Sequence, residues 1–167
     1  MKVRFKKLRE NAKLPTKAHD DDFCYDVYAC DCKKVAPGVY KYPLGFAVQI
    51  DDDEDVGLAH FGEHVETGDY KFSGWEDTIL SIDFRPRSSI WRTGMVLCNS
   101  CGTVDRGYTG EISAFFYHVM PNMPKYEPGE RVAQMKIGFT VPIEFIEVDE
   151  LEETERGDGG FGSTGQK

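Results

Sequence analysis

The chain has 167 residues, of which 40% are hydrophobic and 13% aromatic, and this composition indicates a globular domain with a core of its own. Its formal net charge of −9 and its pI near 4.9 exclude broad, sequence-independent binding of DNA or RNA, because such binding needs a basic surface. A phosphate-bearing ligand would therefore be bound by a few local arginines and backbone amides.

The N-terminal residues MKVRFKKLRE are positively charged, but no apolar run long enough for a signal peptide or a membrane span follows them. We therefore expect a cytoplasmic protein with no membrane contact and no stable binding of nucleic acid. In that compartment the five cysteines are expected to be reduced thiols and not a disulfide framework.

Short segments of strand-like composition alternate with turn signals along the chain. The segment Tyr40–Ile50 predicts a strand pair bent at Pro43 and Gly45, and one helical turn is predicted near Ser88–Arg92. Many short strands separated by turn signals predict an all-β fold, a jelly-roll-like β-barrel. No internal repeat is present. The other predicted strands are a short one at Val3 and Phe5, then Phe23–Ala29, Ile79–Phe84, Met95–Leu97, Glu111–Val119, Arg131–Phe139 and Ile143–Val148.

Two regions differ in composition from the predicted barrel. Residues 51–78 begin with the acidic run Asp51–Asp55 and stay polar, which predicts an exposed acidic insertion. The glycine-rich residues 156–167 cannot offset the entropy of ordering by burying surface. We therefore predict a barrel domain over 1–155 that contains the insertion, and a flexible C-terminal arm over 156–167.

The C-terminal arm carries chemistry as well as glycine. Arg156, Phe161 and the run Gly162-Ser163-Thr164-Gly165 suit a phosphate chain and a flat ring. Glycines let backbone N–H groups approach phosphate oxygens, and hydroxyl and guanidinium groups add donors. Two interpretations stay open from these residues alone: a tail that folds onto a nucleotide, or a disordered Gly-Ser tail.

Two patterns of metal-ligating residues are weaker than they first look. Cys30-x-Cys32 together with Cys98-x-x-Cys101 could form a four-thiolate zinc site, but the first spacing is too tight for a zinc knuckle. The residues His60–His64 match the H-x-x-E-H pattern of a zinc peptidase group. No helical periodicity supports that motif, and a glycine interrupts it, so neither zinc site is favoured.

Two other segments suit a phosphorylated ligand. Arg87-Ser88-Ser89 follows a predicted strand and Pro86, and these side chains suit phosphate oxygens, although a capped helical turn with a surface arginine explains them equally well. The turn-rich segment Asn99–Glu111 predicts a hairpin pocket. There Asn99 and the backbone can meet a base edge, Asp105 can act as a base on water, and Tyr108 can pack against a sugar.

Taken together, these segments resemble the five motifs of the trimeric dUTP diphosphatases (dUTPases), in the same order. The departures are Asp20-Asp21-Asp22-Phe23-Cys24, where the family has small residues before its Tyr-Asp, and the length of the insertion 51–78. The five segments are Ala18–Ala29, Pro86–Ser89, Gly102–Glu111, Gly129–Met135 and Arg156–Gly165.

The resemblance implies a jelly-roll β-barrel that forms a homotrimer with three active sites shared between subunits. It implies hydrolysis of dUTP to dUMP and diphosphate with Mg²⁺ as cofactor, which keeps uracil out of DNA and supplies dUMP for thymidylate synthesis. By the resemblance Asp105 activates the water that attacks the α-phosphorus. Asp26 would lie in the second shell of the Mg²⁺, through metal-bound waters.

The remaining roles also follow from the resemblance. Arg87, Ser88 and Gln134 would hold phosphate oxygens, and Asn99 with the hairpin backbone would recognise uracil in a slot too narrow for thymine. Tyr108 would pack on the deoxyribose, Phe161 would stack on the base, and the arm would grip the terminal phosphates. The implied substrate-binding residues are Arg87, Ser88, Ser89, Asn99, Gly102, Thr103, Val104, Tyr108, Gln134, Arg156, Phe161, Gly162, Ser163 and Thr164.

Two alternatives share the scaffold. A dCTP deaminase would explain Arg87-Ser88-Ser89 followed by Arg92 and Gly94, but that chemistry needs a glutamate where this chain has Ala114-Phe115-Phe116. A non-catalytic binding or signalling protein could use residues 51–78 as its partner surface. The complete set of acid, arginine and tail residues favours an active enzyme.

Overall fold

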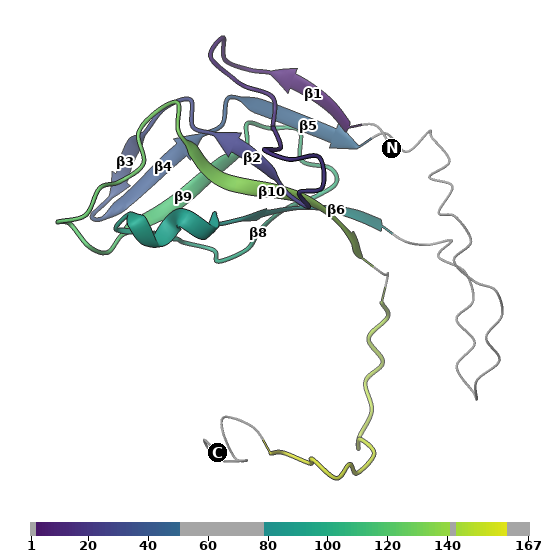
Figure 1. The fold of residues 1–167 in the computed structure, drawn as a ribbon. Coiled ribbons are helices and arrows are strands. Elements are labelled where there is room, and N and C mark those ends of the chain that lie inside the picture. The colour runs from purple at the N-terminus through teal and green to yellow at the C-terminus, as the bar shows by residue number, and fades with distance from the viewer. Residues whose placement is uncertain (1–2, 51–78, 141–142, 160–167) are drawn as a thin grey trace.

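The computed structural model of the chain describes residues 3–50, 79–140 and 143–159 (Figure 1). The predicted insertion over 51–78 and the arm residues 160–167 lie outside the described residues. The predicted domain boundaries therefore stay a prediction.

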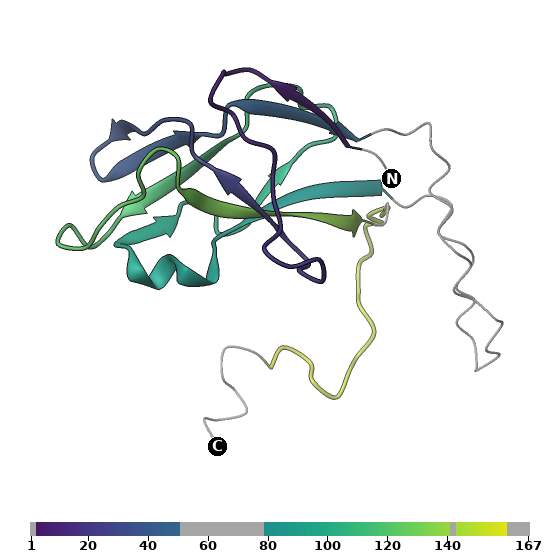
Figure 2. The ribbon, with the colours of Figure 1, turned by 45° about the horizontal axis from the view of Figure 1, so that its top comes forward.

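The described residues form an all-β fold with one short helical turn, as the sequence predicts. Two four-stranded antiparallel sheets are present, with strand orders β2-β10-β6-β8 and β3-β4-β9-β7, and β1 pairs with β5 beside them (Figures 1 and 2). The elements are β1 (Val3–Lys7), β2 (Tyr25–Tyr28), β3 (Lys33–Ala36), β4 (Val39–Pro43), β5 (Phe46–Ile50), β6 (Ile79–Arg85), η1 (Ser88–Arg92), β7 (Met95–Leu97), β8 (Gly102–Val104), β9 (Ser113–His118) and β10 (Arg131–Thr140).

The inner faces of the two sheets share one hydrophobic core. Along β9, Ala114 and Phe116 are buried while Phe115 and Tyr117 are exposed, which is the period of two expected of a strand with one wet face. The hydroxyl of the buried Tyr42 donates to the carbonyl of Tyr126 at 2.9 Å, so the ring keeps its polar atom paired. Burial raises the pKa of that hydroxyl far above its ordinary value.

The bend predicted between two strands at Pro43 and Gly45 is confirmed. β4 ends at Pro43 and β5 begins at Phe46, and Gly45 between them has φ of +76°. A Cβ at Gly45 would collide with the sulfur of Cys30 and lie 3.0 Å from the Cβ of Ala12. Glycine is therefore required at this turn both for its backbone angle and for space.

The predicted strand at Ile143–Val148 is wrong. These residues form no strand, and the segment runs away from the barrel with no chain beside it (Figure 1). Alternating apolar residues create a strand only where a neighbouring edge accepts their backbone hydrogen bonds. Conversely, the short strands β3 and β8 were not predicted, because β3 has no buried residue and β8 lies among turn residues.

All five cysteines are free thiols, as expected. Cys30 is buried beside the carbonyl of Leu44, and burial raises the pKa of its thiol, whereas Cys98 and Cys101 are exposed. Within residues 3–50, 79–140 and 143–159 no group of three or more His, Cys, Asp or Glu side chains could hold a metal ion. The four cysteines of the disfavoured zinc site are therefore not gathered into a group of metal ligands within the described residues, and His60–His64 lies outside them. No helix in the described part of the chain is long and apolar enough to cross a membrane.

Candidate active site

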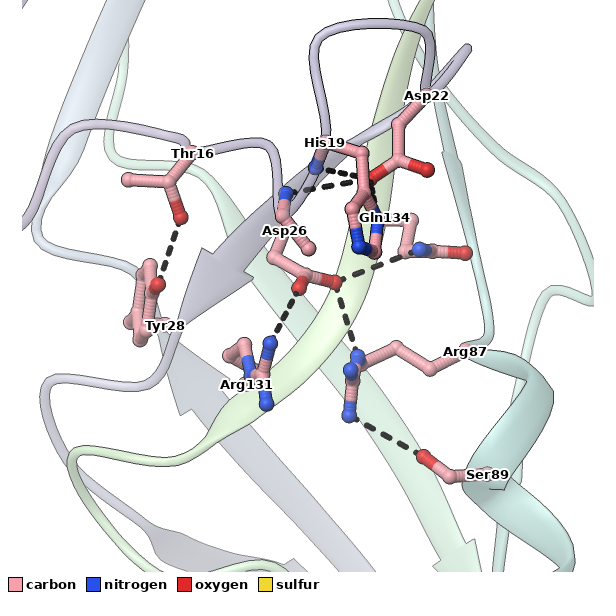
Figure 3. A network of polar contacts seen from close by, with 10 residues as sticks. Thr16, His19, Asp22, Asp26, Tyr28, Arg87, Ser89, Arg131 and Gln134 are labelled. Atoms are coloured by element: carbon pink, nitrogen blue, oxygen red, sulfur yellow. Dashed lines mark hydrogen bonds and ion pairs between the residues drawn. The ribbon is translucent and has the colours of Figure 1, made fainter.

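Asp26, on the edge strand β2, is the centre of a polar network (Figure 3). Asp26 is 6% exposed, and its carboxylate accepts three hydrogen bonds from residues far away in the sequence. Arg87 Nε donates to one carboxylate oxygen at 2.9 Å, and Arg131 Nη1 donates to the other at 3.0 Å. Gln134 Nε2 makes a longer contact of 3.4 Å. Two guanidinium groups thus compensate the buried negative charge.

The register of the sheet explains why these residues meet. Gln134 on β10 pairs with Asp26 on one side and with Arg85 at the end of β6 on the other. Pro86 ends the strand, and Arg87 follows with an extended backbone before η1 begins at Ser88. Segments predicted from three separate motifs therefore converge at one end of the sheet.

The guanidinium of Arg87 is held on two sides. Its Nη1 donates to the hydroxyl of Ser89 at 3.1 Å while its Nε contacts Asp26, as Figure 3 shows. Ser88 is exposed at the first position of η1. Sequence reasoning missed Arg131, whose guanidinium shares Asp26 with Arg87; its place in the fourth motif, three residues before Gln134, was the available signal.

The acidic residues before β2 are arranged by their own loop. The carboxylate of Asp22 accepts the backbone N–H groups of Ala18 and His19 at 3.1 and 3.0 Å (Figure 3). These hydrogen bonds lower the pKa of Asp22, and the one from His19 has the larger effect. The loop is joined to β2 by backbone bonds between Thr16 and Asp26. The extra charge of Asp22 is thus engaged locally and does not contact the Asp26 network.

The predicted catalytic residue, Asp105, lies on the hairpin between β8 and β9. Its side chain is exposed, and its carbonyl accepts the N–H of Tyr108 at 2.9 Å to form a turn. The Tyr108 hydroxyl donates to the carbonyl of Glu111 at 3.0 Å, and its ring lies directly over Gly110. A Cβ at Gly110 would be 2.6 Å from that hydroxyl, so the glycine makes room for the tyrosine.

The other predicted base-recognising residues lie where β8 begins. The Asn99 side chain packs against Gly102, where an added Cβ would be 2.7 Å from Asn99 Nδ2. Ser100 between them has φ of +52°. Thr103 donates to Asp83 at 3.0 Å, and Val104 pairs with Ile82. Asn99, Gly102 and the hairpin are thus one contiguous unit on the edge strand.

Asp26 and Asp105 lie at opposite edges of the same sheet. Across the strands, the order β2-β10-β6-β8 separates them by three strand spacings. Along the strands, Asp26 is level with Gln134 and Arg85, whereas Asp105 follows Val104, whose partner Ile82 lies three residues before Arg85 on β6. With about 4.8 Å between strands and about 3.3 Å per residue, their backbones are roughly 20 Å apart. The structure therefore does not bring together all the predicted site residues within one chain.

The described part of the arm does not reach the Asp26 network. Residues 143–159 run away from the barrel, and Arg156 Nε donates to the carbonyl of Gly159 at 2.9 Å (Figure 1). The predicted arm residues Phe161, Gly162, Ser163 and Thr164 lie outside the described residues.

Comparisons with known proteins agree on one family. A model of the dUTPase family matches residues 84–165. A deoxyuridine 5'-triphosphate nucleotidohydrolase of Alkaliphilus metalliredigens is 34% identical over 166 residues, which cover 99% of this chain and 98% of the relative. The one of Clostridium tetani is 31% identical over 98% of this chain and 97% of its own length.

Solved structures show the same fold. The dUTPase of Staphylococcus bacteriophage 80alpha with dUPNHPP has a TM-score of 0.69 and 21% identity, over 98% of each chain. The dUTPase of phage phi11 of S. aureus has a TM-score of 0.56 and 18% identity, over 93% of this chain and 99% of its own. The chain belongs to the dUTPase family.

Proposed function

We propose that the protein hydrolyses dUTP to dUMP and diphosphate. Water supplies the oxygen that bonds to the α-phosphorus, and the bond from that phosphorus to the α–β bridging oxygen breaks. The water proton passes to a carboxylate, and diphosphate leaves. Such an activity keeps uracil out of DNA and supplies dUMP for thymidylate synthesis.

Asp105 is proposed as the general base. A base must reach the attacking water, and this carboxylate is exposed at the tip of a hairpin whose turn is fixed by Tyr108. The Asp26 carboxylate is instead buried and bonded to the guanidinium groups of Arg87 and Arg131. Asp105 is thus accessible to a water molecule, whereas Asp26 at the other edge of the sheet is buried and paired.

Arg87, Ser88, Ser89 and Gln134 are proposed to hold the phosphate chain. The guanidinium of Arg87 is already oriented by Asp26 and Ser89, so little ordering is required when an anion binds. Charge-assisted bonds from this group would stabilise the negative charge that develops in the transition state.

The hydrogen bonding of the Asp26 carboxylate fits a Mg²⁺ ion that is held through water and not by direct ligation. Both carboxylate oxygens already accept hydrogen bonds from side chains, which disfavours direct ligation. The Asp26 oxygen that accepts the hydrogen bond from Arg131 can still accept a second hydrogen bond, from a metal-bound water. When bound on the triphosphate, the ion would neutralise phosphate charge.

The separation of Asp26 from Asp105 is the observation that carries the shared-site proposal. A water at the α-phosphorus and a metal on the same triphosphate lie within a few ångströms of each other, not roughly 20 Å apart. One active site would therefore combine Asp26 of one chain with Asp105 of another, which supports the homotrimer implied by the family. In the single chain Ile143, Phe145 and Ile146 are also exposed, Phe145 by 90%, and a neighbouring subunit would cover them.

Substrate selection is proposed to rest on the hairpin. Asn99 with the backbone of Gly102, Thr103 and Val104 would bind the uracil edge, and Tyr108 would exclude a ribose 2′-hydroxyl. The arm over 156–167 would close on the nucleotide, with Phe161 on the base and Arg156, Gly162, Ser163 and Thr164 on the phosphates.

Diphosphate release from a panel of deoxynucleoside triphosphates, with Mg²⁺ and with excess EDTA, tests the proposal. We expect release from dUTP far above that from dTTP, dCTP or UTP, and its loss in EDTA. Ammonia release from dCTP would instead indicate a deaminase. Binding of dUTP without turnover would indicate a non-catalytic protein, and either result contradicts the proposal.

A further inference from the structure

Arg9 and Glu111 form a two-pronged ion pair outside the predicted site. Arg9 Nε contacts Glu111 Oε1, and Nη2 donates to Oε2 at 3.0 Å, across 102 residues of sequence. Glu111 lies near the end of the hairpin, two residues before β9, and Arg9 lies two residues after β1. Two parallel bonds fix the orientation of both planar groups, which one ammonium contact could not do.

The ion pair is attached to the rigid turn at Gly45. The backbone N–H of Arg9 donates to the Gly45 carbonyl at 3.1 Å. Backbone bonds between Ile112 and its neighbours Leu44 and Phe46, of 2.9 and 3.0 Å, hold the base of the hairpin to the same turn. Since Gly45 leaves no room for a side chain, this junction tolerates little movement.

The hairpin tip is linked to Glu111 by a chain of hydrogen bonds. The carbonyl of Glu111 accepts the Tyr108 hydroxyl at 3.0 Å, and the N–H of Tyr108 donates to the Asp105 carbonyl at 2.9 Å. Gly107 and Gly110 flank the tyrosine, and Gly107 has open space where a Cβ would be. A glycine-containing tip has many accessible conformations, so its geometry depends on such anchors.

We propose that Arg9 is a positioning residue for the reaction: by fixing Glu111 it holds Tyr108 and Asp105 in their working geometry. The inference rests on the proposed function, in which the hairpin supplies both residues. Arg9 acts through Glu111 and takes no part in the bonds that form or break. Without the guanidinium the half-buried Glu111 carboxylate has lost its two hydrogen-bond donors, so Glu111 is no longer fixed in orientation. Its carbonyl, which accepts the Tyr108 hydroxyl, can then move as well.

Kinetics of Arg9→Gln, Arg9→Lys and Asp31→Asn test the inference. A displacement of about 1 Å at the reacting group costs up to about 100-fold in rate, so we expect kcat of Arg9→Gln to fall at least roughly 10-fold with KM changed less than about threefold. Arg9→Lys should recover part of the loss. Asp31→Asn is the matched control, because Asp31 is 3.7 Å from Arg9 and its loss keeps both bonds to Glu111; its kcat should stay within about twofold.

Hydrogen–deuterium exchange gives a readout that needs no activity. In Arg9→Gln, amides of 105–111 should exchange faster, while those of Tyr25–Tyr28 on β2 should keep the wild-type rate. If the wild type does not turn over dUTP, the proposed function fails, and the exchange pattern still decides whether Arg9 holds the hairpin. Unchanged exchange over 105–111, exchange raised equally throughout the barrel, or kcat within about twofold of wild type in an active enzyme would each overturn the inference.

Discussion

The two edges of the sheet β2-β10-β6-β8 present their carboxylates in opposite ways. At the β2 edge Asp26 is buried and bonded to Arg87, Arg131 and Gln134. Beyond the β8 edge Asp105 is exposed on a hairpin supported from its base. The difference fits two separate roles, in which Asp26 orients the Arg87 guanidinium that would bind phosphate and Asp105 is accessible to the attacking water.

Asp105→Asn should produce the largest loss and separate the two edges most clearly. An amide cannot accept the proton of the attacking water, so turnover of dUTP should fall on the order of 10³-fold or more. Nucleotide affinity and Tm should stay close to wild type, because the side chain is exposed. Rapid-quench turnover, calorimetric titration with a non-hydrolysable dUTP analogue, and thermal unfolding measure the three quantities. Turnover near the wild-type rate would rule out Asp105 as the base.

Deletion of 156–167 should have the next largest effect. Without the arm the nucleotide loses contacts that would form on closure, so turnover should fall by about two orders of magnitude. The strands of the barrel end at Thr140, so the Tm should change little. Turnover and thermal unfolding of the truncated protein give the result, and a truncated protein as active as the full chain would refute the role of the arm.

Asp26→Asn should remove stability as well as activity, whereas Asp105→Asn should remove activity alone. The substitution leaves two guanidinium groups facing a neutral amide, at a cost of about 1–3 kcal/mol, and the Tm should fall by roughly 3–10 °C. Both proteins are compared by calorimetry at the same concentration, because an oligomer unfolds in a concentration-dependent way. Equal Tm values for the two variants would show that the edges do not differ in this respect.

The Arg9–Glu111 pair predicts the smallest effect, a change in acid stability. The bonds from Arg9 hold the pKa of Glu111 below its ordinary value. The stabilisation is therefore complete above about pH 4.3, the unfolded value, and is lost as the pH falls through the lower folded value. The Tm difference between wild type and Arg9→Gln should be present at pH 7 and shrink below about pH 4. A difference that is constant with pH would show that the carboxylate charge does not contribute.

Local patterns predicted most of the strands that have a partner, but they missed the short strands β3 and β8 and wrongly predicted a strand at Ile143–Val148, which has no partner among the described residues. Ala114 to Tyr117 and the segment Ile143–Val148 both contain alternating or apolar residues, yet the first pairs with two strands and the second with none. A periodic sequence specifies which face of a strand is apolar, but not whether an edge is available. The short β8 depends on β6 in the same way.

The candidate site was predictable to the extent that its residues form contiguous motifs. Asp26, Arg87 and Gln134 were chosen by resemblance, and the structure brings them together. The bond from Arg131 to Asp26 spans 105 residues and that from Arg9 to Glu111 spans 102, so neither contact follows from local spacing. The signal available for Arg131 was its place in the fourth motif, and Arg9 lies in none of the five motifs. Such contacts become visible when the chain is folded.

Mixing two inactive variants tests the shared site most directly. Asp26→Asn and Asp105→Asn should each be inactive alone, but mixed oligomers formed by co-expression or joint refolding contain sites with both residues intact. For random 1:1 mixing in a cyclic trimer, about one site in four is complete, so about a quarter of wild-type dUTP turnover should return. If each site were built within one chain, the mixture would stay inactive, and that result would contradict a site shared between chains.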